Sequence, residues 1–123
     1  MWLCLSESFL SIVSHYDDPT KLLVRARAKG HIEAVFPNAK VYRRKGSDYL
    51  YRADIAREEV AKVIGERVTD IDYTNFKNSV KNWALHDAYA GFWTIMYGLQ
   101  SRLARSQRRP KSRINLLNNG KSG

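Results

Sequence analysis

A long apolar stripe near the C-terminal end of the sequence constrains the fold more than any other feature. Six apolar residues recur at spacings of 4, 3, 4, 3 and 4: Leu85, Tyr89, Phe92, Met96, Leu99 and Leu103. This spacing places all six side chains on one side of an α-helix of about five turns. Gly91 and Gly98 each weaken such a helix by roughly 1 kcal/mol relative to alanine, so we expect tertiary packing to hold it.

The first half of the chain instead shows the period of two that is typical of β-strands. In residues 21–27, Leu22, Val24 and Ala26 alternate with Leu23, Arg25 and Arg27, which predicts a strand with one buried and one exposed face. We also expect strands at residues 2–5 and 9–15. A hairpin of residues 40–44 and 49–54 is predicted around the turn Lys45-Gly46-Ser47.

Three further helices are predicted between and after these strands. The first spans residues 30–36, with Ile32, Val35 and Phe36 on its inner side. The second spans residues 56–68, with Asp54 as its N-cap and two glutamates, Glu58 and Glu59, in its first turns. The third covers Phe76, Val80 and Trp83, and begins near Asp72 or Thr74.

The element order predicted from these patterns is β-β-β-α-β-β-α-α-α. Neighbouring strands joined by short turns favour an antiparallel sheet, and the helices would cover one of its faces. The sequence therefore predicts a small α+β fold with a sheet of about five strands.

Positive charge is concentrated at the C-terminal end. The chain has 21 basic and 12 acidic residues, a net charge of +9, and seven of the bases lie in residues 102–123, which contain no acid. We therefore expect a single α+β domain over residues 1–101, followed by a basic, partly disordered extension over residues 102–123.

The chain carries one cysteine, Cys4, so it cannot form an intramolecular disulfide, and this usage favours a reducing cytoplasm. The apolar start, residues 1–13, lacks a basic first segment and contains Glu7, so we interpret it as strand rather than as an export signal. No apolar run approaches the ~20 residues of a membrane span, and no membrane partner is predicted.

Several short segments resemble those of a family of small bacterial proteins to which no activity is assigned. They are Met1–Leu5, Leu22–Arg27, Ile71–Tyr73, Asn75–Lys77, Val80, Leu85–Tyr89, Trp93 and Met96. The resemblance covers roughly residues 1–100 and leaves the basic extension outside. It implies no catalytic residue, cofactor or partner.

The basic extension is the first candidate binding surface. Arg102, Arg105 and Arg109 continue one side of the last helix, and Arg108, Lys111 and Arg113 flank Pro110. Because a guanidinium group donates two hydrogen bonds at once to a phosphate, clustered arginines indicate a nucleic-acid arm. The alternative interpretation is a solvated tail without a specific partner.

The predicted sheet offers a second basic surface. Its bases are Arg25, Arg27, Arg43, Arg44, Lys45 and Arg52, and Tyr42, Tyr49 and Tyr51 are interleaved with them. Exposed sheets that combine cations and aromatic rings stack single-stranded bases in several nucleic-acid-binding modules. The alternative is structural: the tyrosines pair across strands, and the bases keep the open face hydrated.

Catalytic and metal-binding patterns are weak. His86 and Asp87 are adjacent, so on a helix their side chains point about 100° apart and cannot pair with each other. Asp70, Asp72 and Tyr73 precede them and would have to meet them through the fold. The three histidines show no ligand spacing, so no metal and no cofactor are predicted.

Three functions follow as hypotheses. The leading one is a non-catalytic protein that binds nucleic acid or a nucleoprotein complex through the basic extension and the basic hairpin. The alternative is a protein–protein inhibitor or adaptor of bacterial or phage origin, such as a counter-defence factor, since aromatic residues and arginines are favoured at binding hot spots. The third is a small enzyme that uses His86, Asp87 and Asp72. The oligomeric state stays open.

Overall fold

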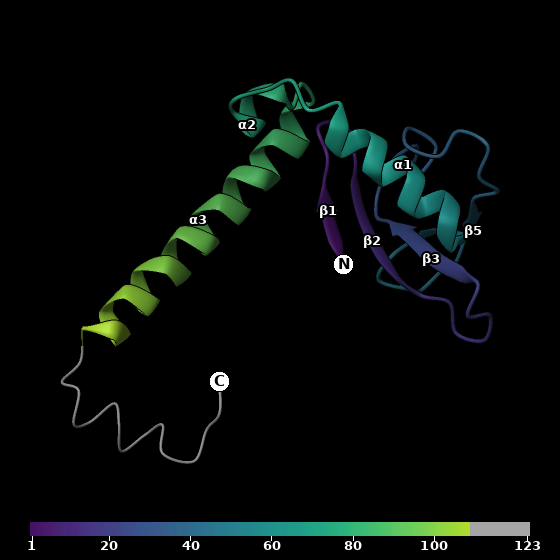
Figure 1. Ribbon diagram of the computed structural model, residues 1–123, viewed down its shortest axis with the longest axis horizontal. Helices are drawn as coiled ribbons and strands as arrows, with labels where there is room; N and C mark the ends of the chain where they lie inside the picture. The colour runs from purple at the N-terminus through teal and green to yellow at the C-terminus, as the bar shows by residue number, and fades with distance from the viewer. Residues whose placement is uncertain (109–123) are drawn as a thin grey trace, which may run out of the picture. The chain divides into compact units, whose positions relative to one another are not determined.

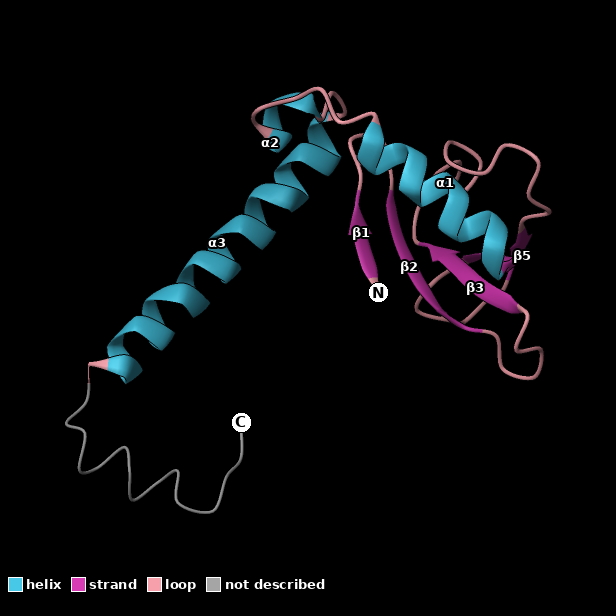
Figure 2. Cartoon of the chain, in the orientation of Figure 1, coloured by secondary structure: helices cyan, strands magenta, loops and turns pink. Residues whose placement is uncertain are grey.

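The computed structural model describes residues 1–108, in which five strands precede three helices (Figure 1, Figure 2). The strands are β1 (Trp2–Cys4), β2 (Phe9–Ser14), β3 (Lys21–Ala26), β4 (Tyr42–Arg43) and β5 (Tyr51–Ala56). The helices are α1 (Arg57–Thr69), α2 (Phe76–Ser79) and α3 (Trp83–Gln107). The predicted disorder of the chain beyond residue 108 lies outside the described residues.

The chain divides into two compact units at Asp87, within α3. The first unit, residues 1–87, contains the sheet, α1 and α2, and the second begins at Ala88. The predicted boundary at residue 101 stays a prediction, and α3 runs past it to Gln107. Within residues 1–108, none of the helices combines the length and apolar character that a bilayer span requires.

The five strands form one antiparallel sheet in the order β1-β2-β3-β5-β4. Val24 in the central strand β3 is paired with Ile12 on one side and Ala53 on the other. Its neighbour Arg25 is paired with Ser11 and Arg52, and these side chains point to the opposite face of the sheet. The predicted small α+β fold with an antiparallel sheet is confirmed.

The core lies between the sheet and α1, which crosses one sheet face (Figure 1). Leu10, Ile12, Val24, Ala53 and Ile55 supply the sheet side of this core. Val60 of α1, together with Ile32, Val35 and Phe36 from the connection between β3 and β4, covers them. The alternation predicted for residues 21–27 therefore places the apolar positions as expected.

Residues 30–36 differ from the prediction, because they form a series of turns rather than an α-helix. The segment is bounded by Gly30, whose φ is +88°, and by Pro37, so too few residues remain to propagate a helix. Ile32, Val35 and Phe36 are nevertheless buried, as the prediction of an inner side requires.

The N-cap predicted for α1 is also wrong. Ala56 occupies that position and makes no side-chain capping hydrogen bond, whereas Asp54 lies within β5. Glu58 and Glu59 lie in the first turn of α1, as predicted.

The third predicted helix is the single turn α2, whose N-cap is Asn75 rather than Asp72 or Thr74, and Trp83 belongs to α3.

Candidate nucleic-acid interface

The tip of the β4–β5 hairpin presents three exposed bases, Arg43, Arg44 and Lys45. The backbone N–H of Arg44 donates to the carbonyl of Leu50 at 2.9 Å, which closes the loop. Gly46 adopts a φ of +79°, a conformation that residues with a side chain rarely adopt. The local backbone therefore turns tightly enough to hold three positive charges at one end of the sheet.

The acid closest in sequence to this tip, Asp48, is engaged elsewhere. Its Oδ1 lies 3.8 Å from Nη2 of Arg52, and its backbone carbonyl accepts a hydrogen bond from Arg27 at 2.8 Å. The contacts of Asp48 therefore go to Arg52 and Arg27 rather than to the three tip bases.

Two other predicted site residues stack on a buried tyrosine. The guanidinium carbons of Arg25 and Arg27 lie 4.5 Å and 4.2 Å from the ring centroid of Tyr49, which is only 3% exposed. Nη2 of Arg25 also donates to Oγ of Ser11 at 2.7 Å. Cation–π contacts of this kind stabilise a fold by roughly 0.5–2 kcal/mol each. These contacts hold Arg25 and Arg27 against the sheet and the connection before β5.

Arg52 is the most buried of the predicted site residues, at 7% exposure. Its Nε donates a hydrogen bond to the backbone carbonyl of Tyr49 at 3.2 Å, so Arg52 contacts the backbone of the tyrosine on whose ring Arg25 and Arg27 stack. Arg52 was predicted to lie on an exposed basic surface of the sheet, and the sequence carried no signal that Tyr49 and Asp48 would contact it.

A second set of exposed bases lies at the end of α3. Arg102 and Arg105 belong to its last turns, Arg108 directly follows its last residue, and all three are exposed. Arg105 is nine residues from Met96, or about 180° around the helix, so it lies opposite the apolar stripe. Arg102 is three residues from Leu99, or about 60° around the helix, so it flanks the stripe. No acid follows Asp87 in the sequence. The predicted site residues Arg109, Lys111 and Arg113 lie outside the described residues.

The acids suggested for an enzyme line a hollow of about 650 Å³ in the first unit. Asp70, Asp72 and Tyr73 form part of its wall after α1, opposite the β1–β2 turn. Its lining also includes the ion pair between Arg67 and Glu7 and the 2.7 Å hydrogen bond between the hydroxyls of Ser6 and Ser79. Neither His86 nor Asp87 is among the described residues of this wall, so the structure does not bring the proposed catalytic set together there.

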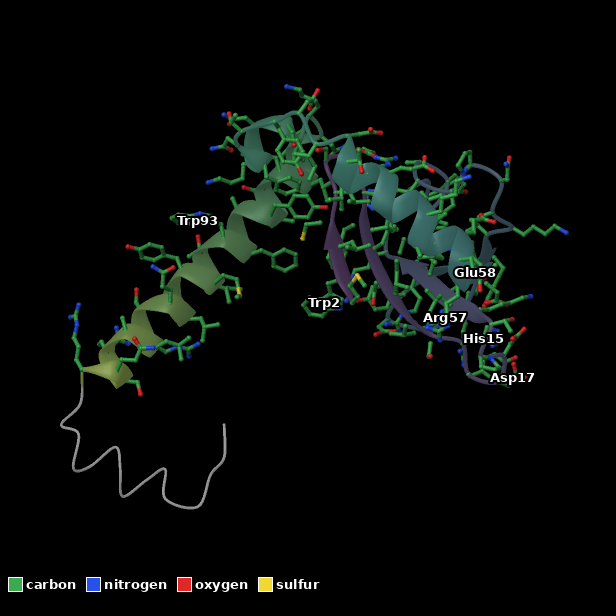
Figure 3. The ribbon with its side chains drawn as sticks, viewed as in Figure 1. Trp2, His15, Asp17, Arg57, Glu58 and Trp93 are labelled. Atoms are coloured by element: carbon green, nitrogen blue, oxygen red, sulfur yellow. The ribbon has the colours of Figure 1, made fainter. Side chains whose placement is uncertain are left out.

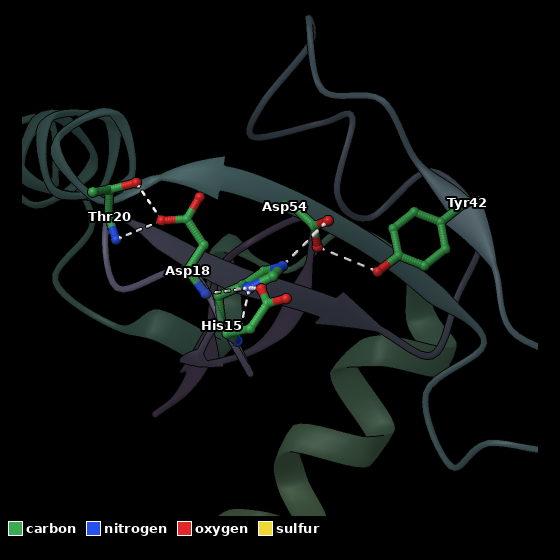
Figure 4. A network of polar contacts seen from close by, with 6 residues as sticks. His15, Asp18, Thr20, Tyr42 and Asp54 are labelled. Atoms are coloured by element: carbon green, nitrogen blue, oxygen red, sulfur yellow. Dashed lines mark hydrogen bonds and ion pairs between the residues drawn. The ribbon is translucent and has the colours of Figure 1, made fainter.

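A polar network around His15 was not predicted (Figure 4). Nδ1 of His15 accepts backbone N–H groups from Asp18 at 3.0 Å and Asp17 at 3.3 Å, and Nε2 lies 3.5 Å from Oδ2 of Asp54. Nδ1 also lies 3.1 Å from a carboxylate oxygen of Asp17, a distance that would suit a protonated Nδ1. We assign the proton to Nε2, because two N–H donors point at Nδ1.

The network continues to Tyr42, whose hydroxyl donates to Oδ1 of Asp54 at 3.2 Å. Burial raises the pKa of Tyr42, and the neighbouring Asp54 carboxylate raises it further.

Figure 3 shows His15 and Asp17 at the same end of the sheet as Arg57, which donates to the Pro19 carbonyl. The network therefore ties the β2–β3 turn to β5. Tyr42 is paired with Arg52 across the hairpin, and Asp54 lies two residues after Arg52 in β5. This spacing of two residues is the sequence signal that was missed.

Features for nucleophilic or metal chemistry are few in the described part of the chain. Partial burial raises the pKa of the Cys4 thiol, which lowers its thiolate fraction. Within residues 1–108, no group of three or more histidine, cysteine, aspartate or glutamate side chains is placed to hold a metal ion.

Comparison of the chain with protein-family models, with curated proteins and with solved structures gives no match.

Proposed function

We propose that this protein is a non-catalytic binding protein that engages nucleic acid or a nucleoprotein complex. The observation that carries the proposal is the exposed arginine set at the end of α3, Arg102, Arg105 and Arg108, in a stretch of sequence without an acid. Successive members are three residues apart, a rise of about 4.5 Å along the helix. Such a row of guanidinium groups is suited to contacting consecutive phosphates.

The hairpin tip supplies the second contact in this proposal. Arg43, Arg44 and Lys45 are exposed, and the acid that follows them, Asp48, is oriented toward Arg52. Arg43 also lies over the ring of Tyr51, 5.7 Å from its centroid. Arg25, Arg27 and Arg52 contact Tyr49 and Asp48, and in this proposal they position the sheet and the hairpin rather than contact phosphate.

The test is binding of the full chain to a fluorescent single strand of about 20 nucleotides and to the matching duplex. One variant removes the α3 arginines (Arg102→Ala, Arg105→Ala, Arg108→Ala), and another removes the hairpin bases (Arg43→Ala, Arg44→Ala, Lys45→Ala). The control removes three exposed lysines elsewhere (Lys21→Ala, Lys29→Ala, Lys62→Ala), so its net charge falls equally. We expect each interface variant to lose affinity by about tenfold or more, and the control to lose far less. Equal losses in all three variants would leave only a nonspecific charge effect.

A protein–protein inhibitor or adaptor is the second candidate, and exposed aromatic side chains on the first unit favour it. Trp2 is 65% exposed and Tyr16 is 86% exposed. Aromatic side chains of this kind are frequent hot spots of protein interfaces. A partner retained after nuclease treatment, and lost with Trp2→Ala and Tyr16→Ala, would favour this function over nucleic-acid binding.

A further inference from the structure

The apolar side of α3 is exposed to an extent that is unusual for a helix in water. Trp93, Met96 and Leu103 are 55%, 59% and 54% exposed, and Figure 3 shows the Trp93 side chain projecting from the helix. A groove of about 570 Å³ runs along these side chains. Residues 88–101 contain no charged side chain at all. A helix with so broad an apolar side normally packs against another element.

The spacing within this side indicates what kind of surface it fits. Phe92, Met96, Leu99 and Leu103 follow one another at intervals of 4, 3 and 4 residues, which is the repeat of a coiled-coil seam. The rings of Trp93 and Tyr97 stack at 5.2 Å between centroids and form one wall beside the seam. A narrow apolar stripe that is bordered on one side by two stacked rings is complementary in shape to a second helix.

We propose that this seam pairs with the same seam of a second copy of the chain, with the two α3 helices antiparallel. A two-fold axis between Tyr97 and Gly98 would set Phe92 opposite Leu103 and Met96 opposite Leu99 of the second copy. Every layer of the contact is then filled by one apolar residue from each copy. The same surface serves both copies, as a closed two-fold dimer requires.

The antiparallel arrangement separates the arginines of the two copies. In a parallel pair, Arg102, Arg105 and Arg108 of both copies would gather at the same end of the dimer. In the antiparallel pair, the two Arg105 positions are on the order of 20 Å apart along the axis, which exceeds the Debye length of about 8–10 Å. Because Arg105 lies on the side opposite the seam, pairing leaves it accessible at both ends of the dimer.

The exposed area is sufficient for a dimer of modest affinity. A fully covered aromatic side chain buries roughly 150–250 Å², so the half-exposed Trp93, Met96, Tyr97 and Leu103 leave roughly 400–500 Å² per copy to be buried. Two copies together would bury about 1,000 Å², which is the size of a weak or transient interface. We therefore expect association at micromolar concentrations. This pairing is independent of the proposed nucleic-acid binding.

The first test is sedimentation equilibrium of the full chain from about 5 to 500 μM, without nucleic acid. We expect a concentration-dependent dimer, which Met96→Glu with Leu99→Glu shifts to monomer. The matched control, Thr94→Glu with Ser101→Glu, adds the same charge on the opposite side of the helix and should leave the dimer intact. A monomer at every concentration, or a dimer that survives the seam variant, would overturn the proposal.

Disulfide trapping tests the arrangement even if the seam variant loses its helix. In a background carrying Cys4→Ser, a mixture of Met96→Cys and Leu99→Cys chains should form mixed dimers faster than Met96→Cys chains couple with themselves. Faster self-coupling would contradict the antiparallel arrangement. If the chain instead stays monomeric and shifts its tryptophan fluorescence on anionic phospholipid vesicles, the apolar side binds a lipid surface and the proposal is wrong.

Discussion

The guanidinium group of Arg25 lies over the ring of Tyr49, with 4.5 Å between the guanidinium carbon and the ring centroid. This contact links the central strand β3 to the connection before β5 and buries the tyrosine almost completely. Arg27 lies over the same ring at 4.2 Å, so a single aromatic residue organises two of the predicted binding bases.

The ring of Tyr49, rather than its hydroxyl, should carry this stabilisation. Tyr49→Phe keeps the aromatic face and should change the free energy of unfolding by less than about 1 kcal/mol. Tyr49→Leu keeps much of the apolar volume but removes both cation–π contacts, which should cost about 1–2 kcal/mol more than the phenylalanine variant. Urea denaturation of both variants measures the difference, and equal losses would show that the stacking adds nothing.

Two glycines should respond to alanine in opposite directions. Gly46 has a φ of +79° in the hairpin turn, so Gly46→Ala should destabilise the fold by about 1 kcal/mol. Gly65 lies inside α1 with open space around its Cα, so Gly65→Ala should stabilise the fold by about 0.5–1 kcal/mol. The midpoint of urea unfolding should therefore fall below the parent value in Gly46→Ala and rise above it in Gly65→Ala. A gain in stability for Gly46→Ala would contradict the turn geometry.

The pKa of Tyr42 should depend on Asp54. Burial and the Asp54 carboxylate favour the neutral phenol in the folded state, so its pKa lies above the ordinary value. The stability from this group is present below a pH of about 10 and is lost as the pH rises through the raised pKa. In Asp54→Asn, the pKa of Tyr42 should fall part of the way back, because burial remains. NMR titration of the Tyr42 ring carbons measures this shift, and an unchanged pKa would refute the coupling.

Asp18 should show the opposite dependence. The hydroxyl of Thr20 donates to its Oδ1 at 2.6 Å, and with the Thr20 backbone N–H this holds the pKa of Asp18 below its ordinary value. The associated stability is present above a pH of about 4 and is lost as the pH falls through the lowered pKa. Thr20→Val should raise the pKa of Asp18, whereas Thr20→Ser should keep it low. NMR titration of the Asp18 carboxyl carbon distinguishes them; the same pKa in both variants would contradict the assigned cause.

Local patterns predicted the elements better than the contacts between them. The alternation of Leu22, Val24 and Ala26 and the stripe from Leu85 to Leu103 predicted β3 and α3, because each depends only on the period of its own element. The segment 30–36 has helix-like spacing, but Gly30 and Pro37 leave it too short to propagate. The roles of Arg52, His15 and Asp54 depend on which strands become neighbours, which the period of a single strand does not specify.

In the proposed function, the exposed arginines at the end of α3 neutralise phosphates, and the salt dependence of binding measures how many phosphates they neutralise. The affinity of the full chain for a duplex should be measured from about 50 to 300 mM NaCl, beside the triple variant Arg102→Ala, Arg105→Ala, Arg108→Ala and the lysine control. We predict that the slope of log K against log salt becomes shallower by about 2–3 in the arginine variant, at roughly 0.9 for each phosphate that the variant no longer neutralises, and barely changes in the control. The same slope in the arginine variant and the control would contradict the account.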